Sequence, residues 1–108
     1  MNERSVAEAL QEAVQERDWA QFHTPANLAK SVVIEAAELL ECFQWDESAD
    51  RGRVAEELAD VLTYCHLLAA RLGLDPDQIV LDKLDVTRKK YPVDQARGRS
   101  TKYDQLSD

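Results

Sequence analysis

Apolar side chains recur along this chain of 108 residues at the three- and four-residue spacing of an α-helix. The longest run lies between residues 51 and 73, where the apolar positions advance in steps of four and three: Val54, Leu58, Val61, Cys65, Leu68 and Leu72. A second apolar face follows residues 25–43 and consists of Leu28, Val32, Ala36, Leu39, Leu40 and Phe43. Both faces are typical of amphipathic helices that pack against other helices.

Signals for helix ends divide the chain into four such helices. Ser5 and Glu8 have the spacing of a capping box, Thr-Pro and Asp-Pro pairs each supply an N-cap and a first-turn proline, and a glycine ends the third helix. The predicted helices run from Ser5 to about Arg17, from Thr24 to about Phe43, from about Arg51 to Gly73, and from Asp75 to Tyr91. We expect a loop over residues 18–23 and an extended tail over 93–108. The prediction is an all-α, four-helix fold in one domain, 1–108.

Composition supports this interpretation and restricts the cellular setting. The chain has three glycines and three prolines, and residues that favour helices dominate. The N-terminal segment is polar and acidic, which predicts no secretory signal, and no stretch approaches the roughly 20 apolar residues that span a bilayer. Cys42 and Cys65 lie in helical patterns without a second cysteine nearby, which favours reduced core thiols. The sequence therefore predicts a cytoplasmic protein with no membrane partner.

The formal net charge of −8 argues against a nucleic-acid partner, because a polyanion would be repelled. Acidic residues crowd the first two thirds of the chain. Seven of the thirteen basic residues fall in the last quarter, namely Lys83, Arg88, Lys89, Lys90, Arg97, Arg99 and Lys102. Such a distribution favours a small phosphate ligand carried with a divalent cation. The alternative interpretation is that these basic residues form only a solvated helix end and a charged tail.

Two carboxylate pairs stand out on the second and third predicted helices. Glu35 and Glu38 are three residues apart, as are Glu57 and Asp60, so each pair projects from one side of its helix. On adjacent antiparallel helices the four carboxylates would share one small volume, which is unfavourable unless a cation compensates them. Oxygen ligands favour Mg²⁺ or Mn²⁺. Chance occurrence on solvated helix faces is the alternative, and the pairs by themselves indicate no reaction.

A di-iron site is disfavoured by the same spacing argument. Helical di-iron bundles use a Glu-x-x-His motif on two helices, and neither His23 nor His66 has a glutamate three residues earlier. We expect His66 to be a packed histidine in an apolar helix. His23 lies in a loop beside two aromatic residues and is a candidate for a binding role.

At this point a family resemblance emerges. The segments E-A-A-E-L-L-E-C-F-Q-W and E-E-L-A-D-V-L-T-Y resemble the E-x-x-E and E-x-x-D signature of the MazG-like, all-α nucleoside triphosphate pyrophosphohydrolases. The flanking R-D-W-A-Q-F-H-T-P-A-N-L and K-K-Y-P-V look like the small dCTP pyrophosphatase type of that superfamily. The resemblance covers residues 15–103.

The resemblance implies hydrolysis of a nucleoside triphosphate, such as dCTP or a modified dCTP, to the monophosphate and pyrophosphate, for house-cleaning of the nucleotide pool. It implies Mg²⁺, or Mn²⁺, held by Glu35, Glu38, Glu57 and Asp60. Glu35 or Glu38 would take a proton from water, and the sequence does not choose between them. A phosphoribosyl-ATP pyrophosphohydrolase and a non-catalytic helical interaction module are the two rival interpretations.

Substrate contacts also follow from the resemblance. Trp19, His23 and Trp45 would lie near the base and sugar, and Tyr64 near the sugar or the metal. The candidate phosphate contacts are Lys83, Arg88 and Lys90, with Tyr91 behind them. Many relatives carry an asparagine near Thr87, so a contact from that position is not expected here. Members of the family associate, and we expect a homo-oligomer, a dimer or a dimer of dimers, with the site near subunit contacts.

Overall fold

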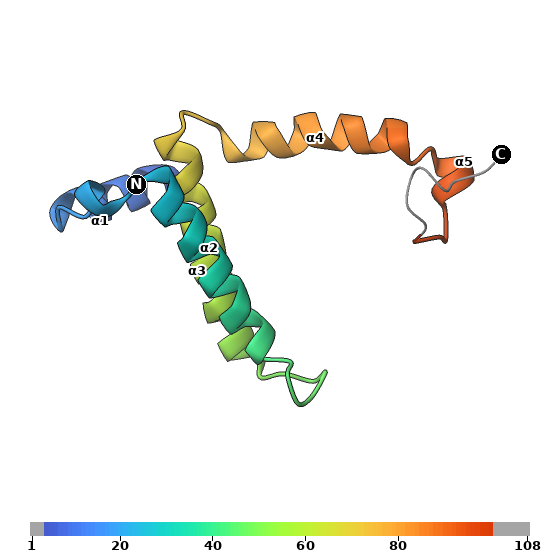
Figure 1. The fold of residues 1–108 in the computed structure, drawn as a ribbon, viewed down its shortest axis with the longest axis horizontal. Helices are drawn as coiled ribbons and strands as arrows, with labels where there is room; N and C mark the ends of the chain where they lie inside the picture. The colour runs from blue at the N-terminus through green and yellow to red at the C-terminus, as the bar shows by residue number, and fades with distance from the viewer. Residues whose placement is uncertain (1–3, 101–108) are drawn as a thin grey trace. The chain divides into compact units, whose positions relative to one another are not determined.

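The computed structural model describes residues 4–100, in which every regular element is a helix (Figure 1). This confirms the predicted all-α class. The elements in chain order are α1 (Val6–Glu16), the 3₁₀ helix η1 (Ala20–Phe22), α2 (Pro25–Glu41), α3 (Arg51–Arg71), α4 (Pro76–Lys90) and α5 (Val93–Ala96).

Local hydrogen bonds explain where the helices begin and end. The four long helices each start at a side-chain cap, formed by Ser5, Thr24, Asp50 and Asp75, whose oxygens accept bonds from backbone N–H groups of the first turn. At the end of α3 the Leu74 N–H donates to the Ala69 carbonyl and the Gly73 N–H to the Ala70 carbonyl. Gly73 adopts φ +70°, the left-handed conformation that this C-terminal motif needs, which confirms it as the helix stop.

Three segments differ from the sequence prediction. Helix α2 ends at Glu41, and the chain continues to Gln44 through tight turns instead of regular helix. The predicted loop over residues 18–23 contains the short helix η1. The extended tail predicted from Val93 is wrong for Val93–Ala96, which form α5 because the Pro92 carbonyl accepts from two N–H groups of the next turn. The last part of that tail, 101–108, lies outside the described residues.

The described chain divides into two compact units, the first ending at Leu74 and the second beginning at Asp75. Within the first unit α2 and α3 pack side by side in opposite directions, and α1 packs against α3 (Figure 1). The second unit holds α4 and α5. The single domain predicted over residues 1–108 stays a prediction.

The core of the described residues is small. Its buried apolar side chains are Val14, Leu28 and Ala69, one each from α1, α2 and α3. Cys42 and Cys65 are free thiols, but Cys65 is exposed, so its predicted place in the core is wrong.

Between residues 4 and 100, no helix is long and apolar enough to cross a membrane.

Candidate metal centre

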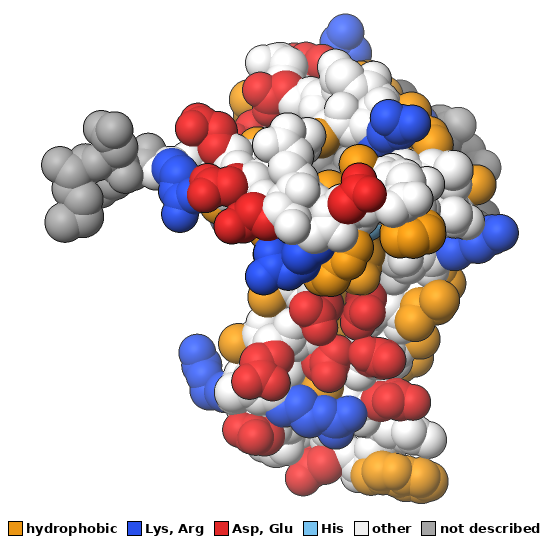
Figure 2. All heavy atoms as spheres, turned by 90° about the vertical axis from the view of Figure 1, so that its left-hand side faces the viewer, with side chains coloured by type: hydrophobic (Ala, Val, Ile, Leu, Met, Phe, Trp, Pro, Cys, Tyr) orange, Lys and Arg blue, Asp and Glu red, His pale blue; other side chains and the backbone are white. Residues whose placement is uncertain are grey.

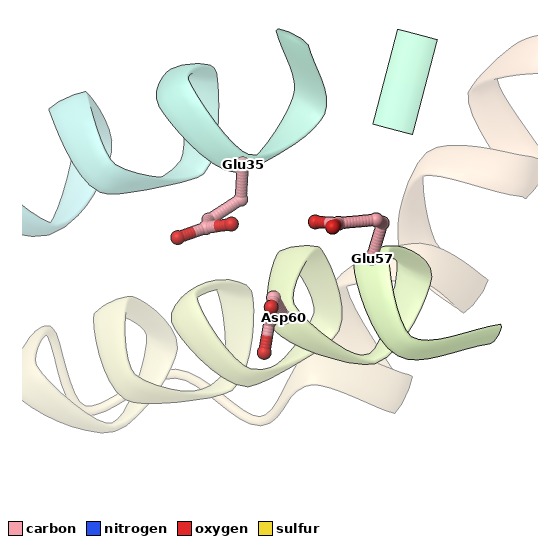
Figure 3. Close-up of side chains that lie close together, drawn as sticks. All are labelled: Glu35, Glu57 and Asp60. Carbon is pink, nitrogen blue, oxygen red and sulfur yellow. The ribbon is translucent and has the colours of Figure 1, made fainter. Parts of the chain in front are cut away.

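The two central helices bring carboxylates together at their contact. Glu35 on α2 and Glu57 and Asp60 on α3 each offer one oxygen, and these three oxygens lie within 4.8 Å of one another. Figure 3 shows Glu35 and Glu57 extending toward each other from the two helices, with Asp60 one turn further along α3. The spacing of three residues between Glu57 and Asp60 puts both on the face of α3 that meets α2.

Two oxygens of this cluster are buried without a hydrogen-bond partner, Glu35 Oε2 and Glu57 Oε2. A buried oxygen that has lost water and gained no donor costs free energy, and the cost is larger when the oxygen carries charge. Both side chains belong to the carboxylate cluster. The arrangement fits a bound cation, which would satisfy the two oxygens at once.

The electrostatics of Glu35 follow from this crowding. Partial burial raises the pKa of Glu35, and a hydrogen bond with Glu38 and the negative charges of Glu38, Asp60 and Glu57 raise it further. All these effects disfavour the ionised form, so Glu35 binds a proton at a higher pH than an isolated glutamate does.

Glu57 is in a similar environment, with one opposing charge. Partial burial raises the pKa of Glu57, and the charges of Glu38 and Asp60 and a hydrogen bond with Glu38 act in the same direction. The positive charge of Arg53 acts in the opposite direction and lowers it. The sequence prediction missed Arg53, although its spacing of four residues from Glu57 was readable as an ion pair on one helix face.

Glu38 belongs to the same neighbourhood but holds a different position. It is exposed, it is not one of the three residues with mutually close oxygens, and it interacts with both Glu35 and Glu57. The four carboxylates predicted from the sequence therefore come together, three in the cluster and Glu38 at its open side. Figure 2 shows further acidic side chains gathered along this face of the α2–α3 pair, with basic side chains among them.

Of the aromatic candidates, Trp19 and His23 lie at the start of α2. Half of the Trp19 side chain is exposed, and the Arg17 guanidinium lies 5.5 Å from its ring centroid. His23 lines a cavity of about 160 Å³ whose other walls come from α1, η1 and the end of α3: Gln11, Val14, Ala20, Leu67, Ala70 and Arg71. Spacing did not predict this cavity, because its walls come from segments distant in the sequence.

Trp45 lies at the opposite end of the same helix. It is 90% exposed and follows α2, whereas Trp19 and His23 precede it. The 17 residues of α2 span about 25 Å, so these aromatic groups of one chain do not meet at one base. One chain therefore does not bring all three to a single base, and their role as base contacts stays a prediction.

The remaining candidates divide between the two units. Tyr64 is partly buried on α3, one turn after Asp60, on the side of the carboxylates. Lys83, Arg88 and Lys90 are exposed on α4, and Tyr91 is partly buried at its end. Their role as phosphate contacts stays a prediction.

Comparison with known proteins adds to this geometry. Residues 30–106 match the MazG-like family. The chain belongs to that family. The match includes both carboxylate-bearing helices, α2 and α3, for most of their length. The family resemblance inferred from the paired carboxylates and the flanking segments is thereby confirmed.

Individual relatives carry names that describe pyrophosphatases. The protein is 45% identical to dCTP pyrophosphatase 1 of Rattus norvegicus and 44% identical to that of Homo sapiens, in each case over an alignment of 101 positions that covers 84% of this chain and 59% of the relative. The chain thus spans about 59% of the length of these relatives. It also resembles the crystal structure of a pyrophosphatase from Archaeoglobus fulgidus, with 37% identity, a TM-score of 0.76, and coverage of 85% of this chain and 98% of that one.

Removing one charge from the cluster should stabilise the metal-free protein. Glu35 has a raised pKa, so it destabilises the folded state at pH values above that pKa and ceases to do so below the ordinary value of 4.5. We expect Glu35→Gln to raise the melting temperature at pH 7 in a chelator. The gain should shrink as the pH falls toward 4.5, because the wild-type side chain then becomes neutral.

Thermal unfolding across this pH range measures the effect. The exposed neighbour Glu56, which is not part of the cluster, supplies the control Glu56→Gln, with an expected change near zero. A lower melting temperature for Glu35→Gln at pH 7 would contradict the importance of repulsion and point to a packing role for this side chain.

Proposed function

We propose that this protein is a metal-dependent pyrophosphohydrolase that converts a nucleoside triphosphate to its monophosphate and pyrophosphate. The observation that carries the proposal is the cluster of Glu35, Glu57 and Asp60, with oxygens within 4.8 Å across α2 and α3. Membership of the MazG-like family and the names of the relatives support it. Because two relatives are named dCTP pyrophosphatase, we take dCTP or a modified dCTP as the substrate and nucleotide house-cleaning as the role.

The donor atoms favour a hard divalent cation. Mg²⁺ prefers oxygen ligands, as does Mn²⁺, and the cluster offers carboxylate oxygens, two of them buried without a partner. Glu35, Glu57 and Asp60 would hold the ion, with Glu38 at the open side. A bound cation supplies charge neutralisation for the substrate phosphates and polarises the phosphorus–oxygen bonds.

The reaction adds water across the bond between the α- and β-phosphates. The water oxygen bonds to the α-phosphorus, the bond from that phosphorus to the bridging oxygen breaks, and the bridging oxygen leaves with pyrophosphate. A carboxylate takes the proton that the water loses. We assign this proton to Glu38, because it is exposed to water and stands outside the three closely spaced ligands.

A second copy of the chain would complete the structure. Val33 and Leu40 on α2 are each 69% exposed, and they lie about 120° to 140° around the helix from the buried Leu28. In the second unit α4 exposes further large apolar side chains, namely Ile79, Val80, Leu81, Leu84 and Val86. Large exposed apolar patches mark interfaces, and a homo-oligomer would bury them.

Association would also supply the aromatic groups that one chain keeps apart. Trp19 and Trp45 lie at opposite ends of α2, about 25 Å apart along the helix axis. If both stack on one base, they come from different copies. We propose this arrangement, with His23 beside Trp19 and Tyr64 nearer the carboxylates.

Charge-neutral substitutions in the cluster test the activity itself. The wild-type protein should release pyrophosphate from nucleoside triphosphates in Mg²⁺ and not in a chelator, with dCTP among the best substrates of a panel of ribo- and deoxynucleotides. Glu38→Gln and Asp60→Asn should abolish the Mg²⁺-dependent reaction, because the first removes the proton acceptor and the second a ligand. Circular dichroism checks that each variant keeps its helices.

The same assay has a clear contrary result. A wild-type protein that releases no pyrophosphate from any nucleotide and shows no Mg²⁺ binding by calorimetry would support the non-catalytic helical module. Near wild-type turnover in either variant would remove that residue from the site.

Assembly is tested by sedimentation. At micromolar concentration we expect a mass that is a multiple of the 12.2 kDa chain. Val33→Glu should dissociate the oligomer, because it would bury a charge in an apolar interface. Gln15→Glu adds the same charge at an exposed polar position of α1 and should not. A 12.2 kDa species with full activity would refute the assembly.

Trp45 tests base recognition. Trp45→Ala should weaken nucleotide binding by about 1–3 kcal/mol, seen mainly in KM, because the base is remote from the bond that breaks. Trp45→Phe should recover most of this loss. Thermal stability should not change, because the side chain is 90% exposed and contributes little packing. An unchanged KM for every nucleotide in the folded alanine variant would exclude a stacking role.

A further inference from the structure

One face of α3 carries a row of chemically distinct side chains. The residues Arg53, Glu57, Asp60, Tyr64, Leu67 and Arg71 follow one another at spacings of four and three, which places them along a single helix face. Leu67 and Arg71 line the same cavity as His23, and the two carboxylates belong to the cluster. The row therefore runs from the cavity, through the carboxylates, to Arg53.

The order of these groups matches the order of groups in a nucleotide. With a rise of 1.5 Å per residue, Leu67 lies about 10 Å along the axis from Asp60, and Arg53 lies about 6 Å beyond Glu57 on the other side. A nucleotide with its base toward the cavity and its reacting phosphate at the carboxylates would extend its terminal phosphates toward Arg53.

The side chain of Arg53 is suited to that position. It is exposed, and the ion pairs found between residues 4 and 100 do not include it. Its charge nevertheless reaches the cluster, since it lowers the pKa of Glu57. A guanidinium donates two parallel hydrogen bonds to phosphate oxygens, and it remains charged at any pH at which the protein folds.

We propose that Arg53 is a substrate-binding residue that contacts the phosphates leaving as pyrophosphate. The inference rests on the proposed pyrophosphohydrolase function and adds a residue outside the carboxylate signature. Arg53 holds the far end of the triphosphate while the carboxylates act at the α-phosphate.

The competing role for Arg53 is charge balance alone. The two roles predict opposite changes in the reaction when Arg53 is removed. Removing a positive charge next to the carboxylates strengthens Mg²⁺ binding in either case. If Arg53 only balances charge, its loss leaves the reaction unchanged or improves it. If Arg53 binds phosphate, its loss impairs the reaction although Mg²⁺ binds more tightly.

The experiment compares Arg53→Ala, Arg53→Lys and wild type for pyrophosphate release from dCTP at saturating Mg²⁺. We expect kcat/KM to fall by about 10- to 100-fold in Arg53→Ala, the loss typical of a charge-assisted hydrogen bond, and to recover partly in Arg53→Lys. Product inhibition by inorganic pyrophosphate should weaken by a similar factor. Inhibition by dCMP should stay within about twofold, because the monophosphate does not reach Arg53.

Arg51→Ala is the matched control. Arg51 is exposed, carries the same charge, and lies two residues away on the opposite side of α3, so its loss should leave all these constants near wild type. An Arg53→Ala variant with wild-type kcat/KM and unchanged pyrophosphate inhibition would overturn the inference while leaving the proposed function intact. A wild-type protein inactive on every nucleotide would instead overturn the proposed function.

Discussion

The properties of the candidate site depend on the repulsion among carboxylates held where α2 meets α3. Glu35 and Glu57 point toward each other with Asp60 beside them, and two of their oxygens are buried with no donor. Folding brings these charges together because apolar side chains of the same helices pack. Partial burial is the largest cause of the raised pKa of both glutamates, and the repulsion raises it further. The packing of this helix pair thus stores an electrostatic cost that a cation can relieve.

This cost gives the site its chemistry. Carboxylates that lack donors bind a hard cation because the cation replaces the lost interactions, and the same cation can meet the phosphates of a nucleotide. In the proposed reaction the exposed Glu38 would accept the proton, and Arg53 adds a positive charge one turn from Glu57. Under the proposed function, a polyphosphate substrate would meet the positive charge of Arg53 beside the carboxylates on one helix face rather than a uniformly acidic surface.

A second constraint is the small amount of apolar surface that one chain buries. The described core is reduced to Val14, Leu28 and Ala69, while α2 and α4 leave several large apolar side chains exposed. A single chain of this length gains little from burial against the entropy of folding. Association with another copy would add the missing burial, and it would place aromatic side chains from two chains around one site. Stability and substrate recognition would then share the same interface.

The sequence by itself determined the features that arise within one helix or one turn. The caps at Ser5, Thr24 and Asp75, the stop at Gly73 and the same-face pairing of Glu57 with Asp60 depend on residues no more than five positions apart, so spacing predicted them. The match to the MazG-like family was also predicted from short segments, those that carry the paired carboxylates and the residues that flank them.

Tertiary structure decided what depends on segments far apart in the chain. It made Glu38 peripheral while Glu35 joined the α3 carboxylates, and it formed a cavity at His23 from three other elements. Periodicity assigns a side chain to a face of its helix. The partner of that face, and so the burial and charge around each residue, is set by the packing of whole helices against one another.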